Sequence, residues 1–427
     1  MSTCRLILNL IDIMTFLYSP INLKPRVPDQ RELEVIDLRY RKALCLWVVD
    51  SKKSFFESMS LIRKSLRLDM PKTPRNREFI SASSIPFVGL GFVSLSERLL
   101  KRAEDDAGGQ IGSWAVALAA SRILLSYRSG SWDSAPQFDP NLVDLAHKTG
   151  ETIYPILYLY ALGNLKAEQG LWNHLDLYAR KAKSIADSYV HESARAAYHH
   201  IRTITLIRKR DFHQALTEAE LGALLTDKAA FRPHYLRFIG NKAIAQALLG
   251  EIEQAKLSVR EGELVLAKQK MIVIWYIIPF LVGRLITHIE LLKQAIECDN
   301  QSDIRQIQRT AHRSAKQAVR KSREFAPYRT WILKLMGNYY WLIGKQRKAL
   351  KWWDKSIQEG ERLGARPDLS RTYFEVGKRL LEPQSKYKDL NGIEAKGYLE
   401  KARVLFEEMG LERDLDDLEK LKANYEL

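Results

Sequence analysis

A repeating pattern of apolar positions, each closed by a turn signal, runs through the middle of the chain. Four such segments follow one another at a constant spacing, and a fifth comes later. They are ILLSYRSG (123–130), GNLKAEQG (163–170), TITLIRKR (203–210), AIAQALLG (243–250) and GNYYWLIG (337–344). Self-similarity at a fixed period is the signature of a repeat array, and the period here is about 40 residues. The sequence therefore predicts successive helix pairs.

Small or apolar residues recur soon after each turn, where the second helix of a pair would begin. They are Ala135, Leu175, Ala215, Ala255 and Ala349. Positions four and seven residues beyond several of these are again suited to a core, and this spacing places them on one helical face. These positions are Ala179, Ala182, Ala219, Gly222, Val259, Gly262, Trp353 and Ser356. Small side chains on that face would let the second helix lie close to the first.

The pattern changes at two places and weakens towards the N-terminus. The turn signal of one unit moves to DNQSD (299–303), which predicts a long first helix and a long basic second helix. Pro, Gly and Ser residues at 20–30 and 71–91 predict linkers or long loops. We therefore expect an N-terminal segment and linker (1–32), a degenerate helix pair or cap (33–70), a loop or linker (71–92), and a helical repeat array (93–427).

The repeat resembles the tetratricopeptide repeat (TPR), a helix-turn-helix unit. The unit that begins at Leu333 carries the resemblance best, through Met336, Gly337, Tyr340, Gly344, Ala349 and Trp353. The resemblance implies an all-α fold, a right-handed superhelical solenoid of antiparallel helix pairs. The period exceeds the family's usual length of about 34 residues, so the helices should be longer by about one to two turns.

The last 100 or so residues resemble the closing repeats of large bacterial signalling proteins that join an ATPase to a cyclase or a protein kinase. The chain has no GxxxxGK[ST] phosphate loop and no cyclase or kinase signature. The resemblance therefore implies a regulatory or scaffold module of a bacterial signalling system. One alternative is that the chain is a truncated or separately encoded part of such an enzyme.

Composition agrees with an all-α, cytoplasmic protein. Apolar residues make up 46% of the chain and charged residues 28%, with 14 prolines and 22 glycines. Cys4, Cys45 and Cys298 lie far apart, which supports neither a disulfide framework nor a thiolate metal site. The apolar run 271–283 is too short to cross a bilayer and contains Pro279, so we expect a buried helix and no transmembrane segment. The first 18 residues suggest a docking helix, with a signal peptide as the alternative.

No group of residues indicates catalysis, a cofactor or a metal. The GLG at 89–91 lacks the third glycine and the βαβ context of a dinucleotide site. His199 and His200 are adjacent, so on a helix they point about 100° apart and do not chelate one ion easily. We therefore expect a non-enzymatic protein.

A solenoid offers a concave groove lined by the first helix of each unit, which suits an extended peptide or a partner helix. In the TPR family, Lys and Asn at two positions of that helix can hold a peptide's terminal carboxylate, and the resemblance places Lys334 and Asn338 there. Trp341, Arg371 and Lys378 are further groove candidates, the two cations for an acidic partner. An ordinary polar surface explains the Lys–Asn pair equally well.

The formal net charge of +16 also favours an acidic partner. Arg309, Arg313, Lys316 and Arg320 follow helical spacing and form one basic stripe. Such a stripe can contact phosphates, so a basic solenoid that binds nucleic acid is the second alternative. We rank it below protein or peptide binding, because solvated basic faces are common and charge alone does not identify a ligand.

Overall fold

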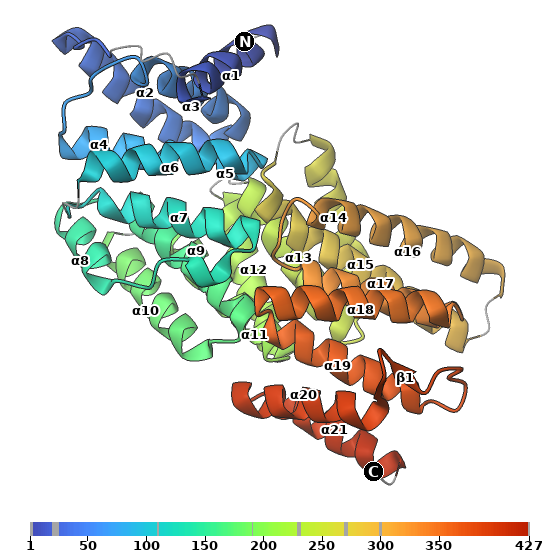
Figure 1. Ribbon diagram of the computed structural model, residues 1–427. Helices are drawn as coiled ribbons and strands as arrows, with labels where there is room; N and C mark the ends of the chain where they lie inside the picture. Colours follow the sequence, from blue (N-terminus) through green and yellow to red (C-terminus); the bar gives the residue numbers. More distant parts are fainter. Residues whose placement is uncertain are drawn as a thin grey trace.

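The computed structural model describes residues 3–18, 25–108, 111–189, 191–228, 232–268, 272–298 and 301–425. Nearly all of these residues lie in helices, and successive helices mostly run in opposite directions (Figure 1). The one sheet among them is a hairpin of two short strands, β1 (Asp389–Leu390) and β2 (Ile393–Glu394). The all-α fold predicted from the sequence is confirmed.

The repeat array consists of helix pairs in which odd-numbered helices come first. The first helices of four units begin at Ile153, Glu192, Arg232 and Ile274, so the first three of these units are nearly equal in length, and the fourth, which ends before Arg329, is longer. The pairs are α9 (Ile153–Gln169) with α10 (Trp172–Tyr189), α11 (Glu192–Arg208) with α12 (Phe212–Lys228), α13 (Arg232–Leu248) with α14 (Ile252–Lys268), α15 (Ile274–Glu297) with α16 (Gln301–Ser322), α17 (Arg329–Leu342) with α18 (Gln346–Leu363), and α19 (Arg366–Leu381) with α20 (Ala395–Met409). A last helix, α21 (Glu412–Tyr425), packs on α19 and α20.

The turns of the array confirm the period read from the sequence. Gly130, Gly170, Gly250 and Gly344 all have positive φ, the region that glycine enters without steric cost. Arg210 takes the equivalent place in its unit and also has a positive φ, 62°. A bulky residue is uncommon in that region, so a specific interaction must hold it there, and its ion pairs, described below, supply that interaction.

The N-terminal third of the chain is more helical than its sequence suggests. It contains α1 (Thr3–Tyr18), α2 (Gln30–Val49), α3 (Ser51–Ser65), α4 (Pro74–Ala82), α5 (Ile85–Leu90), α6 (Val93–Ala107), α7 (Ala115–Ser129), the 3-10 turn η1 (Trp132–Ser134) and α8 (Pro140–Lys148). The helix pair expected at 33–70 is present as α2 and α3. The boundaries proposed for the domains stay a prediction.

A long loop over 71–92 was the wrong expectation, because α4 and α5 occupy most of it. Pro74 and Pro86 lie in the first turns of these helices, where a missing backbone N–H costs nothing. The Thr73 side chain caps α4 by accepting a hydrogen bond from the Asn76 backbone N–H at 3.3 Å. Phe79 and Phe87 are buried, so apolar contacts rather than propensity hold these short helices in place.

Two further expectations from the sequence need correction or fall outside the described chain. Ala135 does not lie early in a second helix, since it follows the 3-10 turn η1 and is only half-buried. That unit instead continues with the short helix α8. The part of the predicted turn at 299–300 and the part of the linker at 20–24 lie outside the described residues, although α15 and α16 are both long, as expected.

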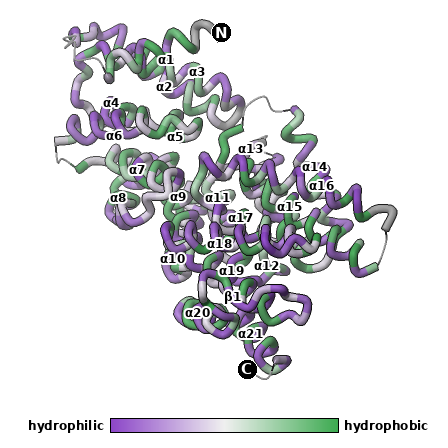
Figure 2. The backbone as a smooth tube through the Cα atoms, turned by 45° about the vertical axis from the view of Figure 1, so that its right-hand side comes forward, coloured by the Kyte–Doolittle hydropathy of each residue, from purple (hydrophilic) through white to green (hydrophobic). Residues whose placement is uncertain are grey.

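Helices α13 and α15 lie very close together. A Cβ atom on Gly240 would overlap the backbone of Phe280, and one on Gly283 would overlap the Gly240 carbonyl oxygen. Two glycines therefore let the helix backbones touch. Helix α15 is long and apolar enough to cross a membrane by length and composition, but 72% of its most apolar stretch is buried inside the protein. It is hydrophobic along most of its length, whereas α10 and α18 are largely hydrophilic (Figure 2).

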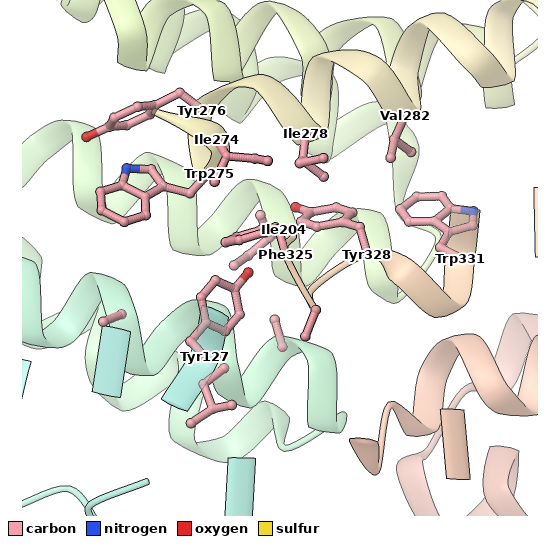
Figure 3. Close-up of a cluster of buried hydrophobic side chains, with 14 of the residues drawn as sticks. Tyr127, Ile204, Ile274, Trp275, Tyr276, Ile278, Val282, Phe325, Tyr328 and Trp331 are labelled. Carbon is pink, nitrogen blue, oxygen red and sulfur yellow. The ribbon is translucent and has the colours of Figure 1, made fainter. Parts of the chain in front are cut away.

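The array curves until its last units meet the helix pair of α9 and α10. Helix α19 contacts α9, although four complete helix pairs lie between them in sequence. The Trp172 Nε1 donates a hydrogen bond to the Met409 carbonyl oxygen at 2.8 Å, which ties α10 to the end of α20. Figure 3 shows a buried hydrophobic cluster nearby in the chain's core, in which Tyr127 of α7, Phe325 and Tyr328 lie close to side chains of α15. The turn between α16 and α17 is hydrogen-bonded to Arg128 at the end of α7 and to Glu168 of α9.

We predict that Gly240→Ala lowers the free energy of unfolding by about 1 to 3 kcal/mol, because backbone atoms cannot move aside to admit a methyl group. Urea denaturation followed by circular dichroism measures the change. Gly397→Ala is the matched control, since Gly397 also lies within a helix but a Cβ there would meet only the Ile393 side chain. Equal effects of the two substitutions would contradict the proposed close contact of α13 with α15.

Candidate binding cavity

The concave side of the array contains a cavity of about 280 Å³. Its walls come mainly from the first helices of consecutive units, α11, α13, α15, α17 and α19, together with α21. The apolar lining residues are Ile207, Phe212, Leu248, Ile286, Ile289, Trp331, Leu335 and Phe374. The polar and charged lining residues are Arg210, Glu290, Lys334, Asn338, Asp368, Arg371, Glu375, Asp414 and Asp417.

Lys334, the first groove residue expected from the sequence, faces this cavity from α17. No hydrogen bond or ion pair with the described residues engages its ammonium group. Burial lowers the pKa of Lys334 from 10.5 to about 8, although the nearby Asp368 carboxylate opposes this effect. The cavity thus contains a cation that has lost much of its water and has gained no direct partner.

Arg371 and Asn338 also line the cavity, but the protein already engages both. Arg371 holds the Asp414 carboxylate through two hydrogen bonds, of 3.0 Å from Nε and 2.7 Å from Nη2. Its Nη2 also donates to the Arg208 carbonyl oxygen at 2.6 Å. The Asn338 Oδ1 accepts a hydrogen bond from the Trp353 Nε1 at 3.0 Å. Of the Lys–Asn pair suggested by the TPR resemblance, only the lysine is fully available.

The structure does not bring Trp341 or Lys378 to the cavity lining. Trp341 is buried against Trp353, and its Nε1 donates a hydrogen bond to the Glu382 Oε2 at 2.9 Å. Lys378 is half-buried on α19. Its charge acts indirectly: burial by itself would raise the pKa of Glu375, but Arg379 and Lys378 keep that pKa below its usual value.

A buried ion network centred on Arg208 adjoins the cavity through Asp368. Arg208 donates hydrogen bonds to the Asp368 Oδ2 at 2.5 Å and to the Glu168 Oε1 at 2.7 Å. All three residues are at most 4% exposed. The guanidinium also lies over the ring of Trp331, 4.8 Å from its centroid. Burial alone would lower the pKa of Arg208, but the two carboxylates hold it above its usual value, so the arginine stays charged.

A second ion cluster explains the strained backbone of Arg210. The Arg210 Nη1 lies 2.6 Å from the Asp417 Oδ2 and 3.3 Å from the Asp414 Oδ1. These contacts join the turn after α11 to α21, at the far end of the array. Arginine at this turn therefore offsets its strain with cross-array ion pairs that glycine would not make.

Ion pairs within the protein neutralise most of the charged side chains that line the cavity. Five carboxylates and three cations line it, and arginines pair with four of the carboxylates, namely Asp368, Glu375, Asp414 and Asp417. Glu290 has only a loose contact with Lys293, at 3.8 Å, and burial raises its pKa. The Asp368 Oδ1 is buried and accepts no hydrogen bond from the described residues. The Lys334 ammonium and the Asp368 Oδ1 are therefore the donor and the acceptor in this lining that lack a hydrogen-bond partner among the described residues.

The basic stripe predicted from the sequence lies on α16, outside the concave cavity. Arg309, Arg313, Lys316 and Arg320 are all exposed on α16, the second helix of its unit, and none of them forms an ion pair with the described residues. They do not line the concave cavity. Among the described residues, no cluster of three or more His, Cys, Asp or Glu side chains has an arrangement suited to a metal ion.

Comparison with known proteins identifies the fold. No family model matches the sequence, and no curated protein matches it significantly. Among solved structures, the chain is similar to the crystal structure of a Rap protein complexed with Competence and Sporulation Factor, with a TM-score of 0.53 at 12% identity. The match covers 83% of this chain and 94% of the Rap chain. This likeness confirms the TPR-like helical-repeat fold, and it does not test the resemblance to ATPase-linked signalling proteins.

Sequence reasoning missed the residues that close the array, chiefly Arg208, Arg210 and Asp368. One local signal was present, because TITLIRKR ends in Arg210 where the other aligned segments end in glycine. A bulky cation at a position that favours glycine indicates that its side chain has a specific partner. The partners themselves are up to 207 residues away in sequence, so the pattern of one repeat could not reveal them.

We predict that Arg208→Met lowers the free energy of unfolding by about 3 to 5 kcal/mol, because it leaves Glu168 and Asp368 buried without a counter-charge. Chemical denaturation measures this loss. Adding Glu168→Gln and Asp368→Asn to the same variant should restore part of it, since neutral amides cost less to bury than carboxylates. A triple variant less stable than Arg208→Met would contradict this account.

We also predict that Lys334 titrates near pH 8 in the folded protein. Reductive methylation with carbon-13 and an NMR titration should show one methyl-lysine signal with that midpoint, and Lys334→Gln should remove it. The unfolded chain keeps a pKa near 10.5, so it binds more protons than the folded chain between pH 8 and 10.5. This group therefore makes the free energy of unfolding rise across that range. Lysine signals that all titrate near 10.5 would contradict the burial of this ammonium.

Proposed function

We propose that this protein is a non-catalytic helical-repeat module that binds a segment of another protein, or a peptide, in its concave cavity. The observation that carries the proposal is that the Lys334 ammonium and the Asp368 Oδ1 both lack a hydrogen-bond partner among the described residues, in a cavity lined partly by apolar side chains. A peptide group supplies both a carbonyl acceptor for the first and an N–H donor for the second. An unpaired polar group in a buried site is costly, so a ligand that satisfies both groups gains affinity.

The chemistry of the lining refines the expected partner. The expectation of an acidic partner came from the net charge of +16 and from Arg371 and Lys378. In the cavity itself carboxylates outnumber cations, and Asp414 neutralises Arg371. A segment with apolar side chains and no strong negative charge therefore suits this cavity best, with any single carboxylate placed at Lys334.

We further propose that the module serves a cytoplasmic signalling system as a regulatory or scaffold component. The sequence resemblance of its C-terminal part to bacterial signalling proteins supports this role. The Rap protein with a similar fold was solved in complex with Competence and Sporulation Factor, so a fold of this kind is compatible with binding such a factor.

Site-specific photo-crosslinking tests the cavity as the binding site. A benzoylphenylalanine in place of Phe374, which lines the cavity, should crosslink a partner in cells of the source organism. The same amino acid in place of Trp352, half-buried on α18 outside the cavity lining, is the matched control. Mass spectrometry of the crosslinked product identifies the segment. Crosslinks from position 352 but none from 374 would contradict the proposal.

A synthetic peptide of the identified segment then tests the role of Lys334. Lys334→Gln should weaken binding about 10- to 100-fold, as expected for a lost hydrogen bond to a charged group. Lys355→Gln removes the same charge from an exposed position of α18 and should leave the affinity unchanged. Fluorescence anisotropy measures both. Equal affinities for the wild type and Lys334→Gln would exclude the ammonium as a contact.

A further inference from the structure

A second pocket, of about 230 Å³, lies between α16 and the turn that joins α17 to α18. It shares no lining residue with the concave cavity. The residues that line it are Gln308, Arg309, His312, Tyr339, Tyr340, Ile343, Lys345 and Lys348. In Figure 1 these helices lie on the side of the array away from the N-terminal helices. The pocket is therefore a separate site.

The charged side chains that line this pocket are all cationic. Arg309, Lys345 and Lys348 are exposed cations, and no Asp or Glu belongs to the described lining. None of the three forms an ion pair with the described residues, although ion pairs are frequent elsewhere in the chain. Like charges gathered without a counter-ion repel one another, so an anion that binds among them is stabilised by all three.

His312, which also lines the pocket, is surrounded by positive charge. Its Nδ1 is buried and has no hydrogen-bond partner among the described residues. Burial lowers the pKa of His312, and the charges of Lys316, Lys345 and Lys348 lower it further. No anionic group enters that balance, which indicates a positive potential around the ring.

Three aromatic rings, of His312, Tyr339 and Tyr340, line the pocket beside these cations. Tyr339 stacks on His312 with the ring centroids 5.4 Å apart, and its hydroxyl donates to the Gln308 carbonyl oxygen at 3.4 Å. Tyr340 is half-buried, and the Lys348 ammonium lies 5.5 Å from its ring centroid. An aromatic wall next to a cluster of cations suits a ligand that carries both negative charge and a planar group.

We propose that this pocket binds a small phosphorylated molecule, with its phosphate held by Arg309, Lys345 and Lys348 and its remaining part against Tyr340. Arginine forms forked hydrogen bonds with phosphate oxygens, and lysine contributes a mobile charge. A water molecule takes a share of about 30 Å³ in the liquid, so 230 Å³ leaves room for a phosphate and an attached group. The pocket shares only one residue, Arg309, with the basic stripe.

Isothermal titration calorimetry on the full chain at 0.15 M salt tests the site, with pyrophosphate and ATP as probes. Arg309→Gln should weaken the binding of both about tenfold or more. Arg320→Gln is the matched control, because it removes the same charge from the same exposed face of α16 but does not line the pocket. The two arginines are eleven residues apart, about 16 Å along the helix, which exceeds the screening length of about 8 Å at this salt concentration.

The probes also separate two sources of affinity. Tyr340→Leu should weaken ATP binding but not pyrophosphate binding if the planar base packs on the ring. Equal losses from Arg309→Gln and Arg320→Gln would overturn the proposal in favour of general attraction by the stripe. Binding of a single-stranded 20-nucleotide DNA without binding of either small probe would also overturn it, in favour of nucleic acid. An absence of binding by both probes at millimolar concentration would exclude the site.

Discussion

The ion network of Arg208 is the constraint on which the rest of the array depends. One buried guanidinium bridges Glu168 on α9 and Asp368 on α19, two helices from distant units of the chain. Removing three charges from water is expensive, and their mutual attraction offsets that cost only when the geometry is good. A network of this kind therefore favours one arrangement of α9, α11 and α19 over others.

Closure creates the cavity as a consequence. Once α19 and α21 meet α9 and α11, the first helices of consecutive units face one another across a confined space rather than an open groove. The charges needed for closure line part of that space, but their partners neutralise them. The lining then retains apolar side chains, the ammonium of Lys334 and the Asp368 Oδ1, and the last two have no hydrogen-bond partner among the described residues. The candidate binding site is therefore a product of the same contacts that hold the superhelix shut.

The outer face follows different rules. The second helices of the units present their charged sides to solvent, where an isolated charge costs little and needs no partner. On α16 this leaves a row of unpaired cations, and only where the α17–α18 turn approaches does the row meet aromatic rings and a pocket. One fold thus offers two chemically distinct surfaces, a largely neutralised apolar interior and a positively charged exterior.

The sequence by itself determined the elements and their period, because both depend on neighbours within one unit. Glycines at the turns and small residues at helical spacing are local requirements, and they located the turns at Gly130, Gly170, Gly250 and Gly344. The prediction of a loop over 71–92 was wrong. Pro74 and Pro86 lie in the first turns of helices whose aromatic residues Phe79 and Phe87 are buried against the rest of the protein. The tertiary structure alone decided which charges are available. From the sequence, Arg371, Trp341 and Lys334 were equally good candidates for contact with a ligand. In the folded chain Arg371 and Trp341 form hydrogen bonds with Asp414 and Glu382, whereas the Lys334 ammonium forms none with the described residues.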